Sequence, residues 1–385
     1  MATDARPLAG LTVVDLTRVL AGPYCTLVLA NLGARVIKIE RPKTGDDVRA
    51  VGPFVNGKSL YFSALNCDKE SIALDLRAHD DRVVFEQLLD RADVLVENFR
   101  AGALARLGYG WDVLHARWPR LVYGAVSGFG QTGPLSNRPA FDMVVQAMGG
   151  ILSLTGQPGG PLARVGVSIG DIAAALFLTI GIQAALAKRA TTGVGSMVDV
   201  AMLDCQLAIL ENALTTHLVT GVVPGPLGTR HPNIAPFQAF RTQDRPIVIC
   251  AGHDAQFSAL CGAVGRTDLI GDARFDTADH RRTNADALEH ELESALTTRP
   301  AAEWLDVLAH AQVPVAPINT VADAVRSPQV AARHMVNAVP DPTIGTLYVA
   351  GNPIKMSEVP ERESRRPPPE IDADRAAILA WLRGG

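Results

Sequence analysis

The chain has 385 residues, of which 48% are hydrophobic and 20% charged, with a formal net charge of -4. This composition is typical of a globular protein, and the absence of a basic stripe argues against a nucleic-acid partner. The length predicts two domains, or one large domain with an insertion. The five cysteines are scattered without C-x-x-C spacing, so we interpret them as reduced thiols and expect no metal site.

The N-terminal segment and one long apolar run bear on the location of the protein. Residues 1–7 include Asp4 and lack the apolar segment of a signal peptide. The longest apolar run, residues 172–187, contains Gln183 and is slightly too short for a membrane span. We interpret this run as a fully buried helix, and we expect a cytoplasmic protein that makes no membrane contact.

The first part of the chain alternates short apolar strands with helices. Strands are predicted at residues 11–16, 35–40, 71–76, 93–96 and 121–126, and helices at 23–32 and 82–91. This alternation predicts an α/β fold with a parallel, doubly wound, Rossmann-like sheet.

The rest of the chain predicts a second, smaller α+β domain. The segment 221–236 is rich in glycine and proline, as in a linker or an active-site loop. The other predicted helices are at 141–148, 171–188, 254–264, 284–296, 301–311 and 374–382, and the strands at 197–202, 246–251 and 347–350. We assign residues 1–205 to the large domain, 206–327 to the small domain with its linkers, and 328–385 to a C-terminal segment that returns to the large domain.

Two sequence signals suggest a nucleotide site, and we interpret neither as one. Residues 52–59 match the P-loop pattern, but polar residues precede them and 60–65 show no helix signature. Glu40 ends the second predicted strand, where dinucleotide-binding proteins carry an acidic residue. However, the first turn, residues 17–23, lacks the required glycines, and Pro23 removes an amide. This turn still leads into a helix N-terminus, which could bind another phosphorylated ligand.

Arginines follow three of the predicted strands. Arg41 and Arg77 come directly after their strands, and Arg100 follows Asn98 and Phe99. In open α/β sheets, ligands bind outside the carboxyl ends of the strands, where guanidinium groups can hold phosphates by charge-assisted hydrogen bonds. The pattern favours a bulky anionic ligand, with a solvated charged rim as the alternative.

Asp171 is the strongest candidate for chemistry. It follows Gly170, which would let a substrate approach the backbone closely, and it precedes the long apolar helix. As an N-cap, its carboxylate would be kept ionised by the helix dipole and amide donors, as a nucleophile requires. A purely structural cap is the alternative, and Asp142, near another predicted helix start, has the same ambiguity.

The chain resembles the class III CoA-transferases, the formyl-CoA and carnitine CoA-transferase family, nearly from end to end. The segments that carry this resemblance are DLTRVLAGP (15–23), GARVIKIERP (33–42), VENFR (96–100), GFGQTGP (128–134) and GVSIGD (166–171). The resemblance implies Asp171 as a covalent nucleophile and coenzyme A and acyl-CoA as substrates. It also implies no tightly bound cofactor, and an interlocked homodimer.

The CoA pocket of that family can be placed on this chain position by position. The implied contacts are Val19, Leu20, Ala21, Arg41, Leu74, Asp75, Leu76, Arg77, Asn98, Phe99, Arg100, Arg106, Pro139, Ala140, Phe141 and Asp142. Formyl-CoA transferase has glutamine at the position of Leu20 and lysine at that of Pro139, and both differences argue against formate and oxalate. For oxyanion stabilisation or acceptor binding we consider Gly170, Arg164, Arg230 and His231.

The implied activity is transfer of coenzyme A from an acyl-CoA, for which we favour succinyl-CoA, to a small dicarboxylate or hydroxy acid. The reaction would pass through an aspartyl-CoA thioester. Racemases of 2-methylacyl-CoA are one alternative, but they carry a histidine where this chain has Phe141, and a phenyl ring cannot exchange a proton. A non-catalytic CoA-binding regulator is the other, and the intact Gly170–Asp171 pair argues against it.

Overall fold

A computed structural model describes residues 5–362 and 364–384 of the chain. The chain divides into two compact units. The first extends to Leu152 and includes Arg164–Val223 and the chain from Pro328 onward, whereas the second comprises Ser153–Ala163 and Pro224–Ser327. The small domain with its linkers was expected at residues 206–327. The second unit also ends at Ser327, but its long segment begins at Pro224, later than expected.

The first unit is built on a parallel sheet, which has six strands within the described residues, in the order β5-β2-β1-β6-β7-β8. The strands are β1 (Thr12–Asp15), β2 (Arg35–Glu40), β5 (Lys69–Ala73), β6 (Val94–Glu97), β7 (Val122–Ser127) and β8 (Met197–Ala201). Taken along the chain, this order is 3-2-1-4-5-6, the doubly wound arrangement in which the direction of winding reverses between β1 and β6. The prediction of an α/β fold with a parallel central sheet is confirmed.

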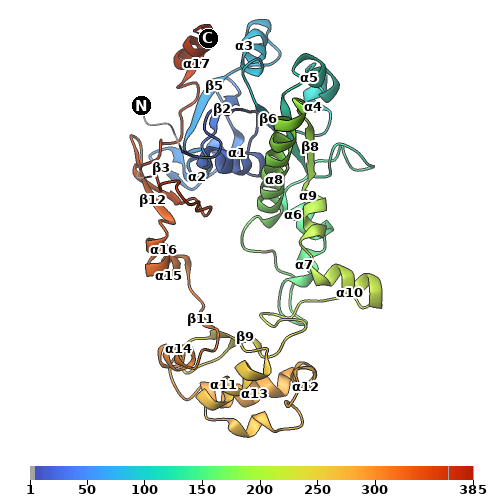
Figure 1. Cartoon of the computed structure of the whole chain (residues 1–385), viewed down its shortest axis with the longest axis vertical. Coiled ribbons are helices and arrows are strands. Elements are labelled where there is room, and N and C mark those ends of the chain that lie inside the picture. Colours follow the sequence, from blue (N-terminus) through green and yellow to red (C-terminus); the bar gives the residue numbers. More distant parts are fainter. Residues whose placement is uncertain (1–4, 363, 385) are drawn as a thin grey trace. The chain divides into compact units, whose positions relative to one another are not determined.

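Helices cover both faces of this sheet. The helices α1 (Ala21–Asn31) and α8 (Ile169–Thr192) pack side by side on one face (Figure 1). The helices α3 (His79–Leu89), α5 (Trp111–Arg117) and α17 (Arg375–Arg383) contribute to the core on the opposite face. Because successive strand residues point to opposite faces, Val13 belongs to the first core and Val14 to the second.

Helix α8 differs from the prediction in its start and in its burial. It begins at Ile169, two residues before Asp171. Leu178 and Ile182 are fully buried, but Ile180 is 62% exposed, because only one stripe of a helix faces the sheet. The prediction of a fully buried helix was therefore wrong. By length and composition the helix could cross a membrane, but 44% of its most apolar stretch is buried inside the protein, and Leu178 and Ile182 belong to the core of the first unit.

The region of the P-loop match also folds differently from the prediction. Residues 60–66 form helix α2 (Leu60–Asn66), whose N-cap Ser59 accepts a hydrogen bond from the Phe62 amide. The lysine of the match, Lys58, is paired with Asp341 at 2.7 Å and Glu370 at 2.8 Å. The prediction of no helix there was wrong, because α2 begins at a serine cap and not at an apolar periodicity.

The first unit contains further short elements. They are β3 (Phe54–Val55), β4 (Lys58–Ser59), α4 (Ala103–Arg106), α6 (Asp142–Met148), α9 (Met202–Ala208), α10 (Asn212–Thr220), α16 (Pro328–Ala332), β12 (Val336–Asp341), β13 (Gly345–Ala350) and the 3₁₀ turn η1 (Asp47–Ala50). Helix α7 (Ile151–Leu154) spans the first boundary between the units.

The second unit combines a small antiparallel sheet with helices around its own apolar core. Its strands pair in the order β11-β10-β9, with β9 (Phe237–Phe240), β10 (Ile247–Cys250) and β11 (Val315–Pro317). Its helices are α11 (Asp254–Ala263), η2 (Thr267–Ile270), α12 (Ala278–Thr283), α13 (Ala285–Leu296), α14 (Ala301–His310) and α15 (Val321–Val325). Fully buried Phe275, Leu292 and Leu308 belong to this core.

Candidate active site

Two cavities lie in the first unit beyond the carboxyl ends of the central strands. The smaller, of about 250 Å³, is lined from the turns after β1, β6 and β7 and contains Asp171. The larger, of about 450 Å³, is lined from the turns after β1, β2 and β5. Arg18 and Phe99 line both cavities, so the two adjoin. They lie where the winding of the sheet reverses, the usual ligand position in such folds.

Most of the residues that the resemblance implies as CoA contacts line one of these two cavities. The smaller is lined by Val19, Leu20, Ala21, Asn98, Phe99, Arg100, Pro139, Ala140, Phe141 and Asp171, and the larger by Arg41, Leu74, Asp75, Leu76, Arg77 and Phe99. Arg106 lies at the end of α4 and lines neither, although its neighbour Leu107 lines the larger. Arg77 also borders a third hollow, with His79 and Arg82.

Asp171 is the third residue of α8 and not its N-cap, which is Ser168. Burial and the nearby carboxylate of Asp142 raise the pKa of Asp171 to about 7, although a hydrogen bond from the Ala21 amide lowers it. The prediction of a carboxylate kept ionised by the helix start was wrong, because burial outweighs the amide donor. A carboxyl that titrates near neutral pH in a cavity is a candidate for covalent or acid–base chemistry.

Asp142 fixes the first turn of α8. Its Oδ1 accepts a hydrogen bond from the Gly170 amide at 2.8 Å, and its Oδ2 accepts one from Gln146 Nε2 at 2.8 Å. A Cβ at position 170 would lie 2.6 Å from Val145 Cγ2, so only glycine lets α8 approach α6 this closely. Gly170 therefore serves helix packing, and its amide is already bonded to Asp142.

The structure adds residues to the site that the sequence reasoning missed. Arg138, Ser127 and Gly128 line the cavity that contains Asp171. Tyr61 on α2 is influenced by the same carboxylates, since burial and then the charges of Asp171 and Asp142 raise the pKa of its phenol. No motif or spacing marks Tyr61, because α2 was not predicted.

The residues considered for the acceptor lie in two different units. In the first, the Arg164 guanidinium is 3.8 Å from Asp142 Oδ2. In the second, Arg230 is paired with Asp286 and Glu289, each at 2.6 Å, and His231 packs against Phe237. Among the residues that the structure describes, no group of three or more His, Cys, Asp or Glu side chains is placed to hold a metal ion.

Comparison with known proteins gives consistent matches over nearly the whole chain. The model of CoA-transferase family III matches residues 8–375. Acetyl-CoA:oxalate CoA-transferase of Acetobacter aceti is 47% identical, covering 97% of this chain and 95% of that protein. Succinyl-CoA:mesaconate CoA-transferase of Haloarcula hispanica is 38% identical, covering 97% and 95%. The crystal structure of a CaiB/BaiF family protein of Brucella suis superposes with a TM-score of 0.85 at 39% identity, covering 98% and 99%.

The raised pKa of Asp171 gives a direct test of the site geometry. In protein labelled with ¹³C at aspartate Cγ, the Asp171 signal, assigned by its loss in Asp171→Asn, should titrate with a midpoint of about 7. Asp142→Asn should lower this midpoint, because it removes the neighbouring negative charge while keeping an acceptor for the Gly170 amide. A wild-type midpoint near 4, or one that Asp142→Asn leaves unchanged, would contradict the described arrangement.

Proposed function

The chain belongs to CoA-transferase family III and is a CoA-transferase, and on that premise we propose that Asp171 is the covalent nucleophile of the transfer. The observation that carries this proposal is the position of Asp171. Its carboxyl, with a pKa raised to about 7, lies in a cavity at the strand ends that adjoins a larger, arginine-bearing cavity.

The larger cavity suits the nucleotide part of coenzyme A. Its volume of about 450 Å³ lies beyond β1, β2 and β5, with Arg41 and Arg77 in its lining. These guanidinium groups could hold the phosphates by charge-assisted hydrogen bonds. Arg18 borders both cavities, so a ligand extending past it would bring its thioester to Asp171.

The proposed reaction proceeds through covalent intermediates. The Asp171 carboxylate attacks the donor thioester carbonyl and expels CoA thiolate, which leaves a mixed anhydride. The thiolate then attacks the aspartyl carbonyl, releases the donor as a carboxylate and forms an aspartyl-CoA thioester. The acceptor carboxylate attacks this thioester and expels the thiolate, which finally attacks the acyl carbonyl of the new anhydride and frees Asp171. The Ala21 amide, which acts to lower the pKa of the Asp171 carboxyl, would stabilise negative charge on its oxygen during these steps.

We propose a small dicarboxylate as the acceptor and succinyl-CoA as the donor. The two relatives described above are named for oxalate and mesaconate as acceptors, both dicarboxylates, and for acetyl-CoA and succinyl-CoA as donors. Acetyl-CoA is therefore a second candidate donor, and the oxalate relative weakens the argument from Leu20 and Pro139 against oxalate. Arg18, Arg100 and Arg138 line the cavity of Asp171 and could pair with a second carboxylate.

Phe141 favours transfer over racemisation. It is the N-cap of α6, its side chain is 70% exposed, and it lines the cavity that contains Asp171. Proton abstraction from an acyl-CoA needs a titratable side chain there, and a phenyl ring supplies none.

We propose that the protein acts as a homodimer, interlocked as in the family that the sequence resembles, in the cytoplasm. Apolar side chains on two helices of the first unit support association. Phe177 and Ile180 on α8 and Met143 on α6 are 40%, 62% and 49% exposed. Large exposed apolar side chains on neighbouring helices are a feature of protein interfaces when they form one patch.

Replacement of the proposed nucleophile should abolish transfer. Asp171→Ala is expected to lower kcat from succinyl-CoA to a dicarboxylate by at least ~1,000-fold, because no covalent intermediate can form. Wild-type protein mixed with succinyl-CoA should show an acylated or CoA-bearing Asp171 by peptide mass analysis, and hydroxylamine should trap it. Asp112→Ala removes an exposed first-turn aspartate on α5 and should leave kcat unchanged. Transfer that survives in Asp171→Ala would remove Asp171 from this role.

Removing an arginine from the lining of the larger cavity should weaken CoA binding more than it slows the chemical step. Arg41→Ala is expected to raise KM for every CoA ester by roughly 10-fold, with kcat changed by less than about threefold, because the guanidinium would contact phosphate and not the reacting atoms. Arg120→Ala, whose side chain bonds the Gly193 carbonyl away from both cavities, is the matched control. Equal KM values in Arg41→Ala and wild type would refute this placement.

The association state can be measured by sedimentation velocity. The wild-type protein should sediment at twice the chain mass of 40.8 kDa. Ile180→Asp should favour the monomer, because it places a charge in the proposed interface. Val113→Asp changes another exposed apolar residue, on α5, and should remain dimeric. A monomeric wild-type protein would rule out the homodimer.

A further inference from the structure

Val19 has a backbone conformation that its side chain disfavours. Its φ is +68°, in the left-handed region that β-branched residues rarely adopt. The residue lies in the turn between β1 and α1 and lines the cavity of Asp171. Such strain persists only where surrounding groups hold it, and it is commonly found at functional sites.

Three side chains hold the residues of this turn from different directions. Lys38 Nζ donates to the Thr17 carbonyl at 2.6 Å. Asn98 accepts from the Arg18 amide at 2.9 Å and donates to the Arg18 carbonyl at 2.6 Å. Asp46 Oδ1 accepts from the Val19 amide at 3.0 Å. Each backbone group from the Thr17 carbonyl to the Val19 amide therefore has a side-chain partner.

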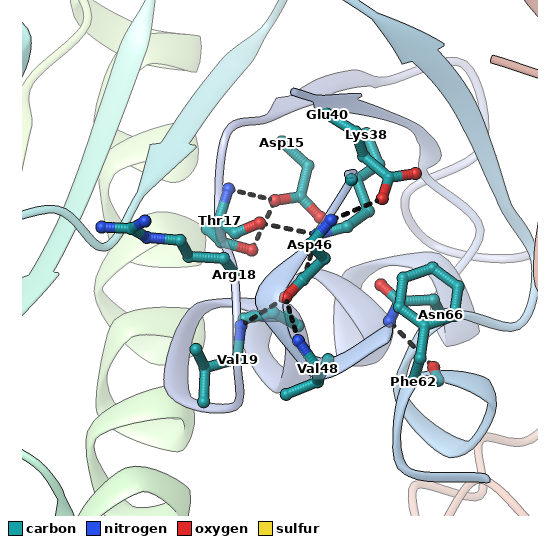
Figure 2. Close-up of polar contacts among 12 residues, drawn as sticks. Asp15, Thr17, Arg18, Val19, Lys38, Glu40, Asp46, Val48, Phe62 and Asn66 are labelled. Atoms are coloured by element: carbon teal, nitrogen blue, oxygen red, sulfur yellow. Dashed lines mark hydrogen bonds and ion pairs between the residues drawn. The ribbon is translucent and has the colours of Figure 1, made fainter. Parts of the chain in front are cut away.

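The groups around Asp46 hold its carboxylate in place as a hydrogen-bond acceptor. Asp46 is 4% exposed, and its Oδ1 also accepts from the Val48 amide at 3.1 Å (Figure 2). Its Oδ2 lies 3.0 Å from the ammonium of Lys38, which is fully buried. Although burial acts to raise the pKa of Asp46, Lys38 and the two amides hold it below its usual value. The carboxylate therefore stays ionised, and a charged acceptor makes the stronger hydrogen bond.

The turn that contains Val19 leads into α1 next to Asp171, the proposed reacting group. Leu20 is the N-cap of α1, and the next residue, Ala21, lines the cavity of Asp171, where its backbone amide acts to lower the pKa of the Asp171 carboxyl. The Val19 amide, held by Asp46, is therefore only two positions before the Ala21 amide. We propose that Asp46 is a positioning residue for the transfer reaction, because it holds Val19 in the left-handed conformation that directs the Ala21 amide at Asp171.

This inference rests on the proposed role of Asp171, but its central contact can be measured without turnover. The Ala21 hydrogen bond lowers the pKa of Asp171, so its loss should raise the titration midpoint. The other charged or titratable groups that act on Asp171 or line its cavity are Asp142 on α6, Tyr61 on α2, Arg18, Arg100, Arg138 and Asp47. None of these residues is replaced when Asp46 alone is changed, but Asp47 follows Asp46 in the chain and pairs with Arg18, so the Asp46 variants are compared with one another as well as with the wild type.

The test compares two substitutions of Asp46. Asp46→Leu removes the acceptor of the Val19 amide, so the Asp171 midpoint measured by ¹³C NMR should rise and kcat should fall roughly 10- to 100-fold, as expected when a reacting geometry is displaced. Asp46→Asn keeps an oxygen acceptor for the Val19 amide but loses the charge beside Lys38, so its midpoint and kcat should lie between those of the wild type and of Asp46→Leu. The double variant Asp46→Leu/Val19→Gly should recover part of kcat and of the midpoint, because glycine adopts positive φ without strain.

A matched control separates positioning from stability. Asp93→Asn breaks the 2.9 Å pair with Arg189 at the amino end of the sheet, far along the strands from Asp171. It should lower the denaturation midpoint while leaving kcat and the Asp171 titration unchanged. If Asp46→Leu does not fold, Asp46→Glu keeps the charge beside Lys38 but displaces the acceptor, and it should shift both readouts in the same direction as Asp46→Leu.

The inference is overturned if folded Asp46→Leu or Asp46→Glu keeps the wild-type Asp171 midpoint, or if Asp93→Asn changes both readouts to the same extent. Failure of the proposed nucleophile would show separately, as transfer that persists in Asp171→Ala. The titration of Asp171 would still report whether Asp46 directs the Ala21 amide.

Discussion

The ammonium of Lys38 is buried beside the turn between β1 and α1, and the geometry of this turn depends on it. It lies on β2, fully shielded from solvent, 3.0 Å from Asp46 Oδ2, and donates to the Thr17 carbonyl. Burial acts to lower its pKa, but the carboxylates of Asp15 and Asp46 raise it above its ordinary value, so the group stays charged. A buried charge is tolerated only when it is paired and hydrogen-bonded, and these pairings connect β2 to the turn after β1.

The protonation of Asp171 is likewise set by burial and by the groups around it. Burial and Asp142 raise its pKa to about 7, whereas the Ala21 amide lowers it. A carboxylate in this balance is ionised in part of the population at neutral pH, and it is less strongly solvated than one in water. Both properties suit a group that must repeatedly gain and lose an acyl bond, because an exposed carboxylate is a weak nucleophile.

Close packing brings the two carboxylates together. Gly170 allows the first turn of α8 to meet α6, and the Gly170 amide bonds Asp142 Oδ1. Another glycine, Gly124 on β7, has the same effect further along the helix, since an added Cβ would lie 2.9 Å from Ile182 Cδ1. The outward face of α8 retains apolar residues such as Ile180, which is consistent with a partner surface.

The sequence by itself determined the parallel α/β class and the ends of the strands at Asp15, Glu40 and Glu97 to within a residue, and it indicated Asp171 as the candidate nucleophile. These features follow from local periodicity, from the rule that ligands bind at strand carboxyl ends, and from the family resemblance. Only the tertiary structure decided the pKa of Asp171, the face that α8 buries, and the hydrogen bond from the Val19 amide to Asp46. Each depends on distances between groups far apart in the chain, such as Asp142 and Asp171, and local pattern carries no information about such distances.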